Sequence, residues 1–163
     1  MPTRKITLSL AVVLALAAAA LWLWQPQLFN GAATPLLKPD DARLLAIGEK
    51  VYVSHCAACH GAQLEGQPEW RTRGADGRLP APPHDASGHT WHHADEVLFN
   101  ITKQGVAVVA KMPDYQSAMP VYQGVLSDEQ IVAVLSWIKS RWPPSARERQ
   151  DLINAEHRKA ARP

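Results

Sequence analysis

The sequence of 163 residues contains only two cysteines, Cys56 and Cys59, and they lie three positions apart. A structural zinc site usually needs more cysteines than this chain provides. An excess of one charge sign is also lacking, because without Arg4 and Lys5 the 17 basic residues fall to 15, equal to the acidic residues. Nucleic acid is therefore not an expected partner. Internal repeats and convincing strand patterns are absent as well, so we expect an all-α fold.

One long hydrophobic run is present, from Ile6 to Trp24, and it follows Arg4 and Lys5. At about 1.5 Å per helical residue, this run approaches the roughly 30 Å hydrocarbon thickness of a bilayer. The apolar region of a cleaved signal is usually shorter, about 7–15 residues. We therefore expect residues 1–24 to form a single transmembrane anchor in a bacterial inner membrane, with the rest of the chain in the periplasm. The alternative is a cleaved signal and a soluble periplasmic protein.

The rest of the chain divides into three parts by composition. Residues 25–39 are a predicted linker, residues 40–142 a folded domain, and residues 143–163 a basic C-terminal tail or helix. Within the domain, residues 61–93 and 106–124 are rich in glycine, proline and polar residues, which favours two long irregular loops.

Three main helices are predicted inside the folded domain. Asp40 is the expected N-cap of the first helix, which runs into Cys56. The second helix covers about residues 94–103, and the third begins with a capping box formed by Ser127 and Gln130. Apolar residues recur at helical spacing on one face of the first helix and of the third: Leu44, Ile47, Val51, Tyr52, Ile131, Val134, Leu135 and Ile138.

A further polar helix is expected over about residues 146–159, with Ser145 as its cap. It lacks a broad apolar face.

Three helices and two long loops bury too little surface for a large core, so a bulky apolar group is expected to fill the centre of the domain.

The two cysteines belong to the sequence Cys56-Ala57-Ala58-Cys59-His60, a C-x-x-C-H pattern that is typical of covalent haem attachment. Each thiol can add to one haem vinyl group, and one helical turn places both sulfurs along the same porphyrin edge. The imidazole of His60 can then bind the iron. A thioredoxin-like pair would need a βαβ setting, and a plain disulfide would leave His60 unexplained. We therefore predict one covalent haem c, held by Cys56 and Cys59.

A second axial ligand must come from further along the chain. Met112 and Met119 are the available thioethers, and each precedes a proline. The alternatives are five histidines: His84, His89, His92, His93 and His157.

Over about residues 40–141 the chain resembles the class I, mono-haem c-type cytochromes. Gly48-x-x-x-Tyr52 precedes the haem motif, and Pro82-Pro83 follows it. Met119-Pro120 comes shortly before the capped final helix. The resemblance implies a small cytochrome c fold, with three main helices and long loops around one covalent haem.

The resemblance also implies roles for individual residues. Met119 would be the distal iron ligand, opposite His60. The carbonyl of Pro82 would accept the Nδ1 hydrogen of His60, which makes imidazole a better ligand. Trp91 would either donate its indole hydrogen to a haem propionate or cover the haem edge as a loop aromatic. Gly48 and Tyr52 on the first helix would pack against Val134 and Trp137 on the last. His84 stands where the family usually has an apolar residue.

With both axial positions filled, the expected function is that of an electron carrier, not an enzyme. It would transfer single electrons between membrane-associated redox proteins, such as respiratory complexes, outside the cytoplasm. Two alternatives remain open. An open-site haem enzyme or sensor would result if Met119 does not bind iron. A copper-handling protein would use the cluster of His84, His89, His92 and His93.

Overall fold

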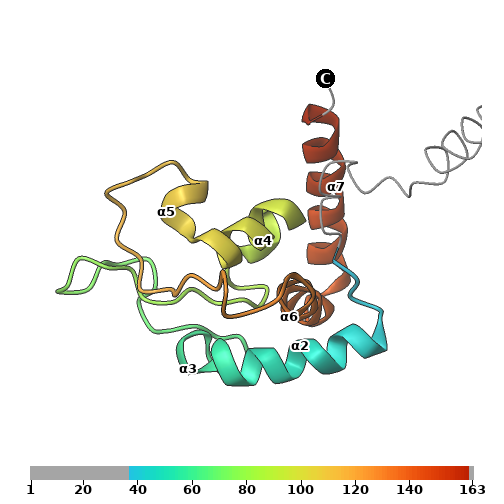
Figure 1. Ribbon diagram of the computed structural model, residues 1–163, viewed down its shortest axis with the longest axis horizontal. Helices are drawn as coiled ribbons and strands as arrows, with labels where there is room; N and C mark the ends of the chain where they lie inside the picture. Colours follow the sequence, from blue (N-terminus) through green and yellow to red (C-terminus); the bar gives the residue numbers. More distant parts are fainter. Residues whose placement is uncertain (1–36, 162–163) are drawn as a thin grey trace, which may run out of the picture. The chain divides into compact units, whose positions relative to one another are not determined.

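The computed structural model describes residues 37–161, so the predicted membrane anchor and most of the predicted linker lie outside the described residues. The described chain is helical, as Figure 1 shows: α2 (Ala42–His55), α3 (Ala57–His60), η1 (Thr90–His92), α4 (Asp95–Gln104), α5 (Val106–Val109), α6 (Asp128–Ser140) and α7 (Pro144–Ala160). Within it, β pairing is limited to an isolated bridge between Gln123 and Leu126, which confirms the all-α prediction. None of the helices between residues 37 and 161 is long and apolar enough to cross a membrane.

Helices α2 and α6 cross at Gly48. Figure 1 shows α6 nearly end-on above α2, which runs across the view. A Cβ atom at Gly48 would lie 2.6 Å from the carbonyl carbon of Ala133 and 2.8 Å from Cβ of Trp137. Beside this point the rings of Tyr52 and Trp137 are 4.7 Å apart. The predicted contact between the first and last main helices is therefore confirmed, and only glycine allows so close an approach.

Adjacent carboxylates at the start of α2 have different partners. Oδ1 of Asp41 accepts hydrogen bonds from the backbone N–H groups of Arg43 and Leu44, each at 3.1 Å. Asp41 is therefore the N-cap, and the prediction of Asp40 is wrong by one residue. Asp40 instead pairs with Arg147 of α7 at 2.9 Å, a contact between residues far apart in sequence.

The other helix ends show which local sequence signals predict a helix boundary correctly. The predicted capping box at Ser127 and Gln130 is confirmed at the start of α6. Helix α4 ends at Gly105, whose φ of +90° is a conformation that favours glycine. The prediction that Ser145 caps the last helix is wrong, because α7 begins at Pro144. Proline suits the first position of a helix, where its missing N–H would have no intrahelical acceptor.

Both predicted loops contain a short helix. Residues 106–124 begin with α5, which is four residues long, and η1 occupies three residues near the end of the 61–93 loop. Helices this short have no periodic pattern to reveal them.

The C-terminal helix α7 packs against η1 and is bonded to the start of α4 through buried polar groups. Oδ1 of Asp95 accepts hydrogen bonds from Nε2 of Gln150 at 2.9 Å and Nδ2 of Asn154 at 3.0 Å. Its Oδ2 accepts from the backbone N–H of Leu37 at 3.0 Å. The side chain of Leu37 joins the hydrophobic core. Asp95 thus ties the end of the predicted linker and α7 to α4, which explains how a helix without an apolar face is held.

Candidate functional site

The C-x-x-C-H residues occupy one helical turn that follows α2 after a break at Cys56. The backbone N–H of His60 donates to the carbonyl of Cys56 at 2.9 Å, which closes the turn. The Tyr52 hydroxyl donates to the carbonyl of Gly61 at 2.6 Å and holds the end of the motif against α2. Cys56 is partly buried against the core, whereas Cys59 is exposed.

The two cysteines are free thiols in this structure. Burial, with a smaller contribution from the neighbouring Cys59, raises the pKa of the Cys56 thiol to about 11. Redox-active cysteine pairs instead depend on a lowered thiol pKa. The environment of Cys56 therefore does not favour a thiol–disulfide exchange site.

The imidazole of His60 is buried and held by one hydrogen bond. Its Nδ1 lies 2.8 Å from the carbonyl oxygen of Pro82, so the predicted contact is present. Because a carbonyl oxygen can only accept, Nδ1 is the donor and Nε2 is the nitrogen left to bind a metal. Burial lowers the pKa of His60, although the bond to Pro82 opposes this. A neutral ring is the form that binds iron.

A second imidazole lies against the first. The rings of His60 and His84 are stacked, with centroids 3.9 Å apart and planes 21° from parallel. Nδ1 of His84 lies 2.8 Å from the hydroxyl of Thr90. Burial, followed by the nearby His60 and His89, lowers the pKa of His84 well below its ordinary value. The sequence showed only that a histidine replaces an apolar residue here, and it did not show this stack.

The two candidate methionines have different surroundings. Met119 is partly buried and packs against the hydrophobic core, as Cys56 does. Its backbone N–H donates to the hydroxyl oxygen of Ser117 at 3.0 Å. The side chain of Met112 is among the exposed large hydrophobic groups, at 48%. The surroundings favour Met119 over Met112 as a ligand to a buried group, and the ligand assignment itself stays a prediction.

Trp91 packs against the same core, and its ring stacks on His92 with centroids 3.7 Å apart. Its indole N–H donates to the carbonyl of Ala86 at 3.3 Å. The predicted bond to a haem propionate stays a prediction, and it would replace the bond to Ala86.

The four loop histidines are neighbours, but they contact one another and nearby aromatic rings rather than converging on one point. Besides the stacks of His84 and His92, His89 stacks on Trp70 at 5.3 Å and meets the edge of His93 at 5.6 Å. Among residues 37–161, no three histidine, cysteine or acidic side chains are placed to share a metal ion. The arrangement therefore does not favour the copper alternative.

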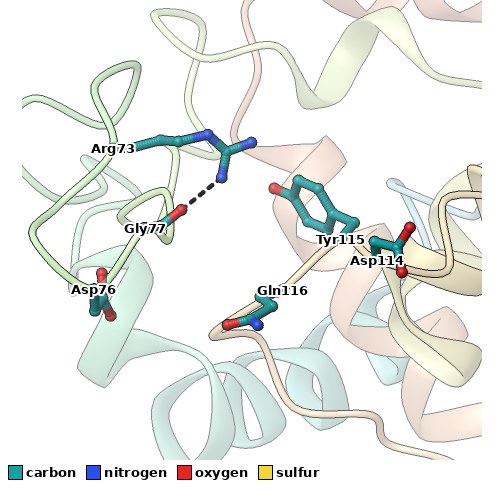
Figure 2. A pocket seen from close by; sticks show the side chains of 6 residues that line it. All are labelled: Arg73, Asp76, Gly77, Asp114, Tyr115 and Gln116. Atoms are coloured by element: carbon teal, nitrogen blue, oxygen red, sulfur yellow. Dashed lines mark hydrogen bonds between the residues drawn. The ribbon is translucent and has the colours of Figure 1, made fainter.

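An open pocket that none of these residues lines lies between the loop at residues 73–77 and the loop at residues 114–116. Figure 2 shows the Arg73 side chain pointing toward Tyr115 across this pocket. The guanidinium donates to the carbonyl of Gly77 at 2.6 Å, and its carbon lies 5.7 Å from the Tyr115 ring centre. Asp76 and Asp114 also line the pocket. Its charged lining does not suit an apolar macrocycle.

The residues around His60 do suit a haem. A single helical turn carries Cys56, Cys59 and the buried imidazole of His60, whose Nδ1 is hydrogen-bonded to Pro82. The two cysteines form no disulfide. The core that Cys56 and Met119 contact is built from large apolar side chains, and it would cover the porphyrin faces: it includes Leu64, Leu98, Phe99, Tyr122 and Leu126. The donor set is sulfur and imidazole, which is that of haem iron in low-spin electron carriers.

Comparisons with known proteins agree with this site. A family model described as Cytochrome c matches residues 45–142, more than half of the chain. A protein described as Cytochrome c6, from Diacronema lutheri, is 27% identical over 97 residues, which are 60% of this chain and 95% of that relative. No solved structure gives a significant match.

Proposed function

Because this chain belongs to the cytochrome c family and carries covalently attached haem c, we propose that it shuttles single electrons between membrane-associated redox proteins. Cys56 and Cys59 would hold the haem, and His60 and Met119 would bind its iron. The observation that best supports this assignment is the buried His60 ring, whose Nδ1 bonds the Pro82 carbonyl, on the helical turn that also carries Cys59 and follows Cys56.

The bound haem supplies one-electron iron chemistry, and the chain sets the conditions for it. The bond from His60 to the Pro82 carbonyl fixes the ring and increases its electron donation. A thioether from Met119 favours the ferrous state and raises the reduction potential. With both positions filled, no site is left for a substrate on the iron, which suits an outer-sphere electron carrier rather than an enzyme.

The ligand assignment can be tested with a pair of methionine variants. In Met119→Ala the haem stays attached, but the iron should become at least partly high-spin and bind carbon monoxide readily. Met112→Ala is the matched control, because Met112 precedes a proline in the same loop and is exposed. Absorption spectra of both oxidation states measure the change. If Met112→Ala opens the iron and Met119→Ala does not, the assignment is wrong.

We also propose that residues 1–24 anchor the protein in a bacterial inner membrane, with the haem domain in the periplasm. The support is the length of the uncharged run from Ile6 to Trp24 and the positive charges before it. Few residues separate this run from Leu37, which is bound to Asp95. The domain would thus meet membrane respiratory complexes at a raised effective concentration.

Cell fractionation combined with the intact mass of the mature chain tests the anchor. The anchored protein is recovered in the membrane fraction with residues 1–24 retained. A soluble periplasmic protein that begins after residue 20 would contradict the anchor and leave the electron-carrier assignment standing.

A further inference from the structure

His84 is fixed more firmly than a residue that only fills space beside His60. Its backbone N–H donates to the carbonyl of Leu64 at 2.7 Å, and its carbonyl accepts from the indole N–H of Trp142 at 2.7 Å. Its ring nitrogen Nδ1 bonds the hydroxyl of Thr90, a buried residue, at 2.8 Å. Both the backbone and the ring plane of His84 are therefore determined by partners.

The fixed ring faces the predicted axial ligand. With centroids 3.9 Å apart and 21° between the planes, the His84 ring covers one face of the His60 ring. The bond from His60 Nδ1 to Pro82 restrains the edge of the same ring. A ring held at an edge and across a face can rotate about its bond to iron only by displacing one of these neighbours.

His84 is not itself arranged as a ligand or a proton carrier for this site. Its ring lies nearly parallel to that of His60, so its nitrogens are not directed at the metal-binding Nε2 of His60. Its Nδ1 is already bonded to Thr90. An aliphatic residue would fill the same space, but it would lack a flat ring and a bond to Thr90 to fix its orientation.

We propose that His84 is a positioning residue that sets the rotational orientation of the axial His60 ring, with Thr90 fixing His84 in turn. The proposal rests on the proposed function, because it takes His60 to be an iron ligand. In ferric low-spin haem the plane of the axial imidazole contributes, together with the second axial ligand, to how unpaired spin is distributed over the porphyrin. A change in the orientation of His60 is therefore measurable.

The test uses proton NMR of the ferric holoprotein, in which each haem methyl group has a separate paramagnetic shift. Three variants separate the contributions. His84→Leu removes the flat ring, His84→Phe keeps a flat ring but loses the bond to Thr90, and Thr90→Val keeps His84 but frees its Nδ1. His92→Leu is the matched control, because this neighbouring exposed histidine stacks on Trp91 and not on His60.

The proposal predicts a changed order or spread of the four methyl shifts in His84→Leu, and a smaller change in the same direction in Thr90→Val. His84→Phe should stay closer to the wild type than His84→Leu, and His92→Leu should match the wild type. An unchanged pattern in both His84→Leu and Thr90→Val would overturn the proposal, as would a Phe variant shifted as far as the Leu variant. If His84→Leu fails to fold, the milder Thr90→Val still tests the proposal: a changed pattern of methyl shifts supports it, and an unchanged pattern overturns it.

These outcomes are distinct from a failure of the proposed function. A wild-type protein whose ferric spectrum lacks methionine ligation contradicts the assignment of Met119 and leaves the stack on His60 testable. A wild type without attached haem contradicts the proposed haem site before any variant is made.

Discussion

A single added methyl group at Gly48 is expected to force helices α2 and α6 apart. In Gly48→Ala the new Cβ would meet the carbonyl carbon of Ala133 at 2.6 Å and Cβ of Trp137 at 2.8 Å. These are backbone and near-backbone atoms, so rotation of a side chain cannot relieve the clash. The helices must separate, and the packing of Tyr52 on Trp137 is lost with them.

The magnitude follows from two opposing contributions. Overpacking a core typically costs about 1–3 kcal/mol, and contact with a backbone carbonyl places this site at or above the upper value. Replacing glycine by alanine inside a helix returns about 1 kcal/mol. We therefore expect a net loss of at least about 2 kcal/mol, which lowers the midpoint of thermal unfolding by roughly 8 °C or more.

The assay is reversible unfolding of the holoprotein in guanidinium chloride and by heat, followed by circular dichroism and by haem absorption. Gly74→Ala is the matched control, because its Cβ would meet only Oδ1 of Asp76 at 3.2 Å and the carbonyl of Arg78 at 3.7 Å. Gly66 is not a suitable control position, because a Cβ atom there would lie 2.5 Å from the backbone nitrogen of Pro83. Equal, small losses for Gly48→Ala and Gly74→Ala would refute the crossing.

Two further predictions concern polar contacts. Asp95→Ala removes the acceptor of three hydrogen bonds. Because each buried donor left unpaired costs about 1–3 kcal/mol, we expect the free energy of unfolding to fall by at least about 2 kcal/mol. Limited proteolysis should then cut α7 early. Unchanged proteolysis would contradict the role of Asp95 in holding α7. Ser127→Ala removes the N-cap of α6 and should cost about 1 kcal/mol in guanidinium unfolding; a change near zero would mean that the capping box contributes little.

The sequence predicted the features that depend on neighbouring residues. Helical periodicity located α2 and α6, and the capping residues Ser127 and Gln130 placed the start of α6. The family resemblance supplied the contact of His60 with Pro82, which helical periodicity cannot reveal because the second residue lies in a loop.

The features that were missed depend on residues far apart in sequence. Asp40 and Asp41 are equally good caps by composition, and the structure uses Asp41 as the cap while Asp40 pairs with Arg147 of α7. The buried bonds of Asp95 leave no periodic signal either. The stack of His84 on His60 likewise depends on how the loop folds back, 24 residues after the haem motif.

The most direct measurement of the central claim is the mass of one peptide. Trypsin is expected to cut after Lys50 and Arg71, and the peptide between them contains both cysteines and His60. After denaturation and acid extraction of the purified holoprotein, we predict this peptide with the mass of one haem added through two thioether bonds. Cys56→Ala combined with Cys59→Ala should give the peptide without haem. An unmodified or disulfide-bonded wild-type peptide, with all haem extracted, would contradict the account.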